Sequence, residues 1–140
     1  MRAYFSRRYL FSASHRLHSE MFSAEKNRET YGKCNNPHGH GHNYVLEVTA
    51  GGQIDPKTGM VCDMVKLDEA VRKNVLERFD HTNLNLDESF RELVPTTENL
   101  CIEICKKLLF SFASGEFGRS ELVRIRVEET DNNSFEFAGA

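Results

Sequence analysis

The sequence predicts an α+β fold, a four-stranded antiparallel sheet with two helices on one face. Apolar and polar residues alternate near both ends of the chain, which is typical of half-buried strands. Two central segments instead repeat apolar residues with the period of a helix. The resulting order is β-β-α-α-β-β, with no repeat, linker or low-complexity segment. The second face of the sheet must also be covered, and a partner subunit is the natural candidate.

The strands are located by their alternation. In the first, Tyr9, Phe11, Ala13 and His15 share one face, so the strand ends with a histidine on its apolar side. The strands are expected at residues 3–17, 40–49, 122–130 and 135–137.

The helices are expected between the second and third strands. One covers residues 66–79, where apolar side chains recur at helical spacing. The other begins at Thr96-Thr97-Glu98, since a threonine caps a helix and a glutamate suits its positive end.

Two connecting segments have turn chemistry. Residues 19–37 are polar and contain a turn signal, so they are expected to be irregular. The sequence DPKTG at 55–59 predicts a turn, interpreted as the tip of a hairpin.

Composition limits the class of protein. A chain of 140 residues is expected to form a single domain, residues 1–140. Its net charge of −3 and lack of a dense Lys/Arg run argue against nucleic acid as the main partner. No stretch approaches the ~20 apolar residues of a membrane span, and no signal peptide is recognised. The four cysteines are interpreted as thiols, and a cytoplasmic location is expected.

Three histidines have a spacing that a zinc ion can use. His40 and His42 lie on one face of a strand, and His15 ends a neighbouring strand. Three protein ligands with no obvious fourth are typical of a catalytic zinc with an open position. His18 and His38 are interpreted as ordinary surface or core residues.

Other residues suggest acid-base chemistry, with alternatives left open. Cys34 lies in a loop beside Lys33, where it is a candidate reactive thiol, an incidental cysteine or a fourth zinc ligand. Asp80 and His81 are either an acid-base pair or a helix-end aspartate beside a surface histidine.

Glu129 stands at the end of the apolar row of the third strand. A carboxylate there is costly unless it is paired, and it matches the planar N–H donors of a guanidine-like heterocycle. The alternative is a solvated residue just past the strand.

These segments together resemble the 6-pyruvoyltetrahydropterin synthase family of tunnelling-fold pterin synthases, which also includes 6-carboxytetrahydropterin synthases. The matching motifs follow the family's order and span nearly the whole chain. They are FSASHRL (11–17), GKCNNPHGHGHNY (32–44), IDPKTGMV (54–61), DHTNLN (80–85), PTTEN (95–99) and ETDNN (129–133).

The resemblance implies the tunnelling fold, with strands of three subunits closing a barrel and two trimers forming a homohexamer. It implies zinc ligands at His15, His40 and His42 and a general base at Cys34. It further implies an Asp80–His81 pair supplied by a neighbouring subunit. Glu129 would hold the pterin with help from Thr96 and Thr97, and it is also a candidate member of the proton relay.

The implied activity is a zinc-dependent lyase of tetrahydrobiopterin biosynthesis. It would convert 7,8-dihydroneopterin triphosphate to 6-pyruvoyltetrahydropterin and release triphosphate, without a nicotinamide. One alternative is a 6-carboxytetrahydropterin synthase of deazapurine (queuosine) biosynthesis. Another is a non-catalytic, zinc-stabilised assembly protein in which Cys34 completes a closed site.

Overall fold

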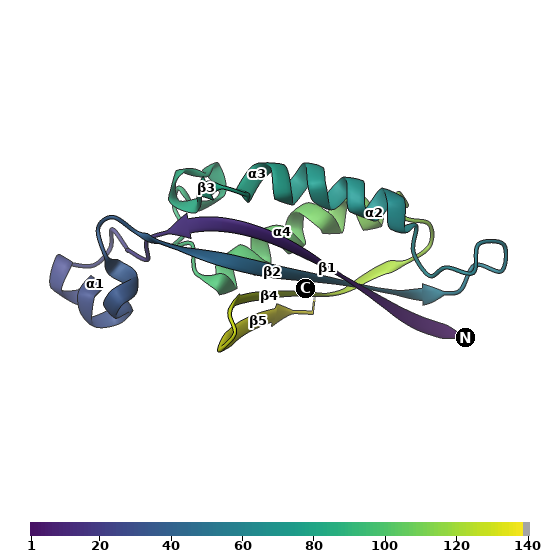
Figure 1. The fold of residues 1–140 in the computed structure, drawn as a ribbon, viewed down its shortest axis with the longest axis horizontal. Helices are drawn as coiled ribbons and strands as arrows, with labels where there is room; N and C mark the ends of the chain where they lie inside the picture. The colour runs from purple at the N-terminus through teal and green to yellow at the C-terminus, as the bar shows by residue number, and fades with distance from the viewer. Residues whose placement is uncertain (139–140) are drawn as a thin grey trace.

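A computed structural model describes residues 1–138 as one sheet with helices on one side (Figure 1). The strands follow the order β3-β1-β2-β4-β5 across the sheet. Their bounds are β1 Arg2–His15, β2 His40–Gln53, β3 Thr82–Asn83, β4 Glu121–Thr130 and β5 Asn133–Phe137.

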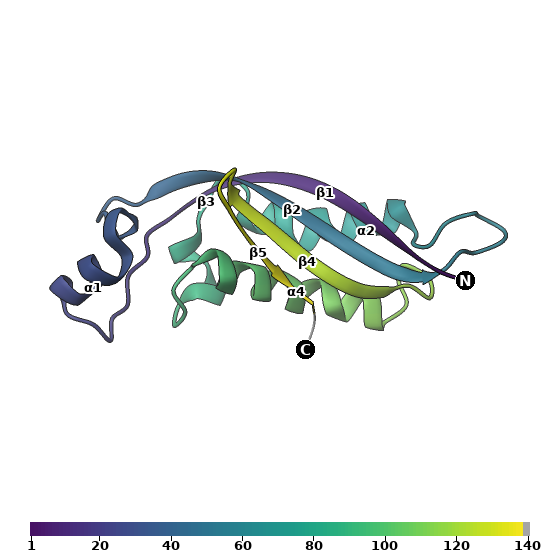
Figure 2. The same cartoon turned by 90° about the horizontal axis from the view of Figure 1, so that it is seen from below.

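The main helices pack against the same face of the sheet, as the view from below shows (Figure 2). The α-helices are α1 Ala24–Tyr31, α2 Met64–Val71, α3 Glu77–Phe79 and α4 Thr97–Ala113. A π-helical turn, η2 (Arg72–Leu76), joins α2 to α3. Short 3-10 turns are η1 Gly32–Asn35, η3 Leu84–Leu86 and η4 Glu88–Phe90.

The α+β class and the four predicted strands are confirmed, but the sheet has five strands instead of four. The additional strand, β3, has two residues and pairs in parallel with β1 at Ala13 and Ser14. The sheet is therefore not wholly antiparallel. A segment of two residues has too little alternation to be recognised from its sequence.

The predicted irregular segment was wrong in part, because residues 24–31 form α1. The Ser23 side chain accepts a hydrogen bond from the Lys26 amide and starts the helix. Its eight residues are mainly polar and give no apolar stripe to recognise. The order of elements is therefore β-α-β-α-β-α-β-β when α2, η2 and α3 are counted as one helical segment.

The turn predicted at 55–59 is present, but it is not a hairpin tip. The Gly59 amide donates to the Asp55 carbonyl oxygen at 2.7 Å, and the chain then continues into α2. This loop projects at the end of the molecule opposite α1 (Figure 1).

The core lies between the sheet and the helices. From the sheet, Phe11, Tyr44, Leu46 and Val48 are buried, and they face buried residues of α2 and α4. Full burial of such a side chain contributes about 1.5–3 kcal/mol to stability. The core fixes which residues of β1, β2 and β4 face the helices, and this positions the site below.

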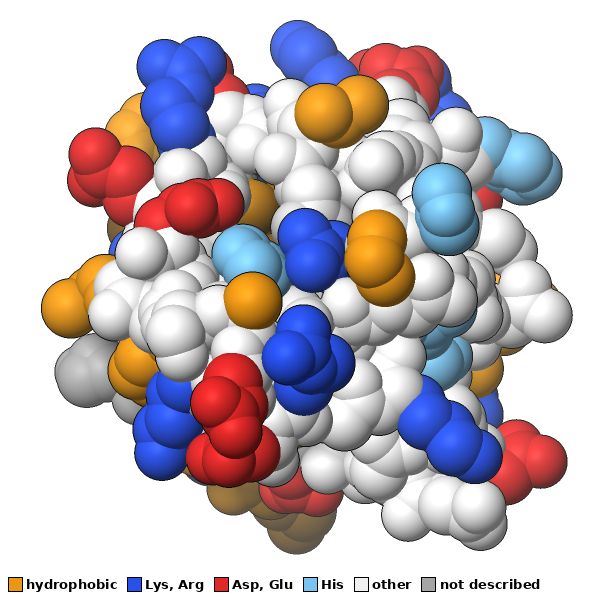
Figure 3. Space-filling view, turned by 90° about the vertical axis from the view of Figure 1, so that its left-hand side faces the viewer, with side chains coloured by type: hydrophobic (Ala, Val, Ile, Leu, Met, Phe, Trp, Pro, Cys, Tyr) orange, Lys and Arg blue, Asp and Glu red, His pale blue; other side chains and the backbone are white. Residues whose placement is uncertain are grey.

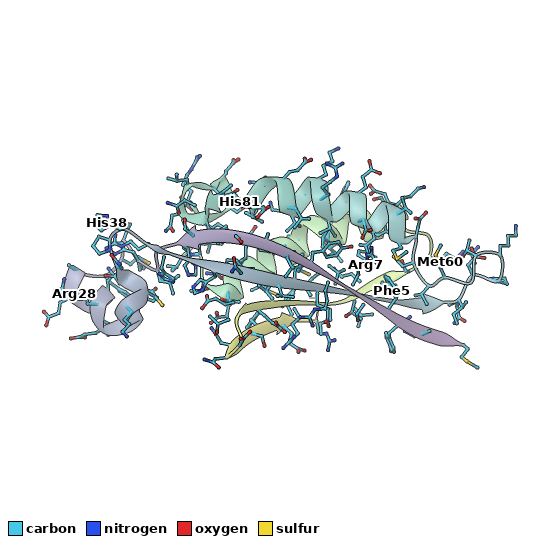
Figure 4. All side chains as sticks on the ribbon, in the orientation of Figure 1. Phe5, Arg7, Arg28, His38, Met60 and His81 are labelled. Atoms are coloured by element: carbon cyan, nitrogen blue, oxygen red, sulfur yellow. The ribbon has the colours of Figure 1, made fainter. Side chains whose placement is uncertain are left out.

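A polar clamp attaches β1 to α2 at the edge of this core. The guanidinium of Arg7 donates to both carboxylate oxygens of Asp68, at 2.7 and 2.9 Å. The Tyr9 hydroxyl donates to the same carboxylate at 2.6 Å. Figure 4 shows Arg7 between β1 and the helical layer.

The other face of the sheet carries charged residues in alternating register. Arg8 lies 3.8 Å from Glu47 and 3.7 Å from Glu128, and Arg124 lies 3.4 Å from Glu47. No helix of the described residues covers this face (Figure 2). No helix in residues 1–138 has the length and apolar character needed to span a bilayer.

Candidate active site

Three histidines meet where β1 ends and β2 begins. His15 pairs with His40 across the two strands, and Ala13 pairs with His42. The strand pleat therefore turns all three imidazoles toward the helices. Their candidate ligand atoms all lie within 4.8 Å of one another, and the Nε2 atoms of His15 and His40 are 3.0 Å apart.

A glycine lets the chain approach this point closely. Gly39 has φ 74°, and a Cβ atom there would lie 3.0 Å from the carbonyl oxygen of His15. A larger residue would be strained by its backbone conformation and crowded by the strand. Gly39 therefore allows His40 to enter β2 directly opposite His15.

His15 is held in one tautomer by its surroundings. It is 1% exposed, and its Nδ1 donates to the carbonyl oxygen of Pro95 at 2.8 Å. This bond leaves the Nε2 lone pair directed at the other two histidines. Burial lowers the pKa of His15, so the neutral form that a metal requires is favoured.

His42 provides a test of whether a metal fits. Its Nε2 atom is buried and has no hydrogen-bond partner among the described residues. Glu129 Oε1 lies 3.7 Å from it, which is too far for a hydrogen bond. A buried nitrogen without a partner is costly, and a metal ion would satisfy it.

The spacing of the three histidines also suits a metal. With Zn–N bonds of about 2.0–2.1 Å, nitrogens in a tetrahedral site lie about 3.4 Å apart. Among residues 1–138, His15, His40 and His42 are the one group of His, Cys, Asp or Glu whose ligand atoms converge in this way. Cys34 is outside that group, so the geometry favours an open site of three nitrogens over a closed one.

Glu129 faces the histidines from the end of β4. Its Oε2 accepts from the Thr97 hydroxyl at 2.6 Å, and its Oε1 accepts from the Asn133 amide at 3.1 Å. Burial raises the pKa of Glu129, but these hydrogen bonds and the nearby His42 outweigh that effect and leave the pKa lowered. The carboxylate is thus ionised and aimed at the site, not solvated beyond the strand.

The two threonines have different roles in this structure. Thr97 orients Glu129, as described above. Thr96 is the N-cap of α4, and its hydroxyl accepts from the Asn99 amide at 3.1 Å. Its side chain is therefore engaged in starting the helix that carries Thr97.

Cys34 lies in η1 and is half-buried. Its carbonyl oxygen accepts from the Leu17 amide at 2.8 Å, which holds η1 beside the chain that leaves β1. Burial raises the pKa of the Cys34 thiol, and the charge of Glu129 raises it further. A dication held by the histidines would oppose both effects.

Asp80 and His81 form a pair at the β3 edge of the sheet. Oδ1 of Asp80 lies 3.0 Å from Nδ1 of His81 and accepts from the Ser12 amide at 2.8 Å. The His81 side chain is 82% exposed, and its backbone φ of 60° is unusual for a residue other than glycine. Such strain is frequent at functional sites. The pair does not belong to the histidine cluster of its own chain.

Three supporting groups were not predicted from the sequence. They are the carbonyl of Pro95, the hydroxyl of Tyr44, which lies 3.3 Å from Nδ1 of His15, and the amide of Asn133. Tyr44 continues the alternation of His40 and His42, so the strand pattern could have indicated it. Nothing in the sequence pattern pairs Pro95 with His15.

Comparisons with known proteins agree with this arrangement. Residues 4–140 match the family model described as 6-pyruvoyl tetrahydropterin synthase. The chain is 44% identical over 135 residues to the human 6-pyruvoyl tetrahydrobiopterin synthase, covering 96% of this chain and 90% of the human protein. It is 42% identical over 138 residues to the Drosophila melanogaster protein of that name, covering 98% and 80% of the two chains.

The fold is also found in a solved structure. The 6-pyruvoyl tetrahydropterin synthase of Caenorhabditis elegans superposes with a TM-score of 0.92 at 43% identity. The match covers 100% of this chain and 97% of that one. The match to the family model, the two relatives and this structure together show that the chain belongs to the 6-pyruvoyl tetrahydropterin synthase family.

Proposed function

We propose that this chain is a lyase that converts 7,8-dihydroneopterin triphosphate to 6-pyruvoyltetrahydropterin and triphosphate, a step in tetrahydrobiopterin biosynthesis. The observation that carries the proposal is the histidine cluster facing an ionised, pre-oriented Glu129. Names of relatives that are 42–44% identical over nearly the whole chain support it. The chain would act as a single domain, residues 1–140, in the cytoplasm.

The Nε2 atoms of His15 and His42 and a ring nitrogen of His40 would hold the metal, which we take to be zinc. Neutral imidazoles suit this ion, and three of them leave a position for substrate. When bound, zinc supplies Lewis acidity that polarises the hydroxyls of the substrate side chain.

Glu129 would bind the amino-pyrimidine edge of the pterin. Each of its oxygens already accepts one hydrogen bond, from Thr97 or Asn133, and a carboxylate has further lone pairs for two ring N–H donors. These two partners hold the carboxylate in place before substrate arrives, so less conformational entropy is lost on binding. Thr96 would contribute by capping the helix that carries Thr97.

Cys34 would act as the general base that removes a proton from a side-chain carbon. The charge of Glu129 contributes to the raised pKa of Cys34, which supports a place for the thiol near the pterin end of the site. The Asp80–His81 pair would come from a neighbouring subunit and exchange the second proton. Its exposed imidazole at a sheet edge suits such sharing.

An assembly would complete the site. We propose that strands of three subunits close into a barrel, with two trimers forming a hexamer. Closing the sheet would cover its charged face and remove the open edges at β3 and β5.

Turnover of the triphosphate tests this function. Zinc-loaded protein incubated with 7,8-dihydroneopterin triphosphate should release inorganic triphosphate without added nicotinamide, and metal-stripped protein should not. The electrons lost by the side-chain carbons enter the pterin ring through proton shifts, so no outside oxidant is needed. Absence of turnover with zinc bound and the oligomer intact would favour a non-catalytic assembly protein.

A further inference from the structure

A pocket of about 510 Å³ lies between α1, η1 and the end of β1. Its lining includes Arg16, Arg28 and Lys33, with His18 beside them, and contains no carboxylate. Figure 3 looks at this end of the molecule and shows Lys, Arg and His side chains near the middle of the face. The chain as a whole is acidic, with a net charge of −3, so this concentration of cations is local.

Within the described part of the chain, the three cations have no acidic partner. None of the ion pairs among residues 1–138 includes Arg16, Arg28 or Lys33. On α1, Arg28 lies one turn after Ala24 on the pocket side, while the acidic Glu25 and Glu29 do not line the pocket. Of the charged side chains of α1, Arg28 alone lines the pocket.

Buried amides hold the walls of the pocket in place. Asn27 is 0% exposed, and its side chain accepts from the Ser19 amide and donates to the Ser19 and Ser23 carbonyl oxygens. Asn35 is also buried, and its side-chain amide donates to the Leu17 carbonyl oxygen at 2.7 Å. α1 and η1 are thus fixed against the chain that follows β1.

Arg16 is oriented by the same structure. Its Nε donates to the Asn35 carbonyl oxygen at 3.1 Å, and its backbone amide donates to the Asn85 side chain at 2.7 Å. No hydrogen bond within residues 1–138 uses its terminal Nη atoms. A guanidinium held at Nε with its Nη groups available is suited to binding an oxyanion.

The pocket adjoins the candidate active site along the chain. Arg16 directly follows His15, and Lys33 directly precedes Cys34, so each neighbouring pair has Cα atoms about 3.8 Å apart. The Leu17 to Cys34 backbone hydrogen bond joins the two segments. The lining of the pocket is therefore continuous in the chain with His15 and Cys34.

We propose that this pocket binds the triphosphate group of the substrate through Arg16, Arg28 and Lys33. The inference rests on the proposed function, since it names the phosphate subsite of the same active site. Guanidinium groups match phosphate oxygens in pairs, and a lysine adds a point charge. The substrate is then held at three points: the pterin at Glu129, the reacting side chain at the histidines, and the phosphates at this pocket.

Direct titration tests the subsite apart from catalysis. Zinc-loaded protein is titrated calorimetrically with inorganic triphosphate, and its zinc content is measured afterwards because triphosphate chelates zinc. Arg28→Gln should weaken triphosphate binding about three- to tenfold, and Arg28→Glu should weaken it further. The matched controls are Arg119→Gln and Arg119→Glu, in the lining of the pocket beside the 55–59 loop. These controls should bind as the unaltered protein does.

Turnover separates failure of the subsite from failure of the function. Arg28→Gln should raise KM for dihydroneopterin triphosphate and leave the binding of dihydroneopterin without phosphates unchanged. Suppose the unaltered protein turns over normally, but Arg28→Glu has the same triphosphate affinity and the same KM as the Arg119 controls. The phosphate subsite would then be wrong, and the proposed function would stand. Triphosphate binding that depends on Arg28 without any turnover would support the anion site and contradict the proposed function.

Discussion

At the scale of single residues, the site depends on strand register. His15 and His40 are direct partners across β1 and β2, and His42 follows two residues later on the same face. A shift of one residue would turn the histidines of one strand to the opposite face. The convergence of the three histidines is therefore a consequence of the same alternation that builds the core.

His40→Ala should lose most of the bound zinc, because two nitrogens remain where three converge. The matched control is His38→Ala. His38 lies two residues earlier, and its side chain is exposed in the turn before β2 (Figure 4). Metal analysis of both purified proteins makes the comparison. Equal zinc contents in the two variants would contradict the assignment of His40.

Glu129→Gln should weaken pterin binding by about 1.5–3 kcal/mol. An amide must turn a donor toward one of the ring N–H groups, whereas a carboxylate accepts from both. Glu128→Gln is the control, because Glu128 lies on the other face of β4 and pairs there with Arg8. Substrate affinity measured with both variants decides the point. The role of Glu129 fails if its variant binds pterin as the Glu128 variant does.

The histidine site could be predicted from residues alone, but its supports could not. The spacing of His15, His40 and His42 predicts that their imidazoles lie on the same face of two neighbouring strands. The Pro95 carbonyl reaches His15 from a segment 80 residues away, and only the tertiary packing of α4 places it there. The position of Glu129 was left open because the sequence cannot show whether the last residue of a strand remains packed.

At the scale of elements, periodicity located what packs against the core. Strands β1, β2, β4 and β5 and the long helix α4 were found because their apolar faces are regular. α1 was missed because it is polar and is held by the caps and amides of Ser23 and Asn27. Because α1 was not predicted, the pocket lined by Arg16 and Arg28 was not predicted either.

The polar clamp between β1 and α2 predicts that the folded protein loses stability in acid. Burial raises the pKa of Asp68, but hydrogen bonds from Arg7 and Tyr9 outweigh it and leave the pKa below its ordinary 3.8. A pKa that is lower in the folded state gives stability that is present above the unfolded value and is lost as pH falls through the folded value. The contribution should thus be complete at neutral pH and disappear below about pH 4.

Asp68→Asn should therefore lower the melting temperature by about 3 °C at pH 7, a small effect because the pair is partly exposed. The difference from the unaltered protein should shrink as pH falls below about 4. Asp131→Asn, in the exposed β4–β5 turn, is the control and should melt as the unaltered protein does at each pH. If the melting temperature of Asp68→Asn stays equally far below that of the unaltered protein down to low pH, the ion pair is not the cause of the difference.

At the scale of the whole molecule, one face of the sheet has no covering layer within residues 1–138. It carries paired charges, and alternation places Tyr4 and Leu10 with them, 65% and 73% exposed. Large apolar side chains on a broad open face are typical of association surfaces. The sequence led to the same expectation from the uncovered second face of the sheet, and the assembly stays a proposal.

Sharing of the active site between subunits can be tested by mixing. Cys34→Ala and His81→Ala should each keep zinc, since neither residue belongs to the histidine cluster, and lose about 10²–10⁴-fold in turnover. Co-assembled mixed oligomers should recover about a quarter of the normal activity, because half of the chains carry each intact group at random. Activity no higher than that of the separate variants would place both groups in sites of a single chain.

The identity of the pterin product tests the central claim most directly. Mass analysis after incubation of the zinc-loaded protein with 7,8-dihydroneopterin triphosphate should show a tetrahydropterin that keeps all three side-chain carbons as a pyruvoyl group. A 6-carboxy product accompanied by acetaldehyde would contradict the account and assign the chain to the deazapurine reaction.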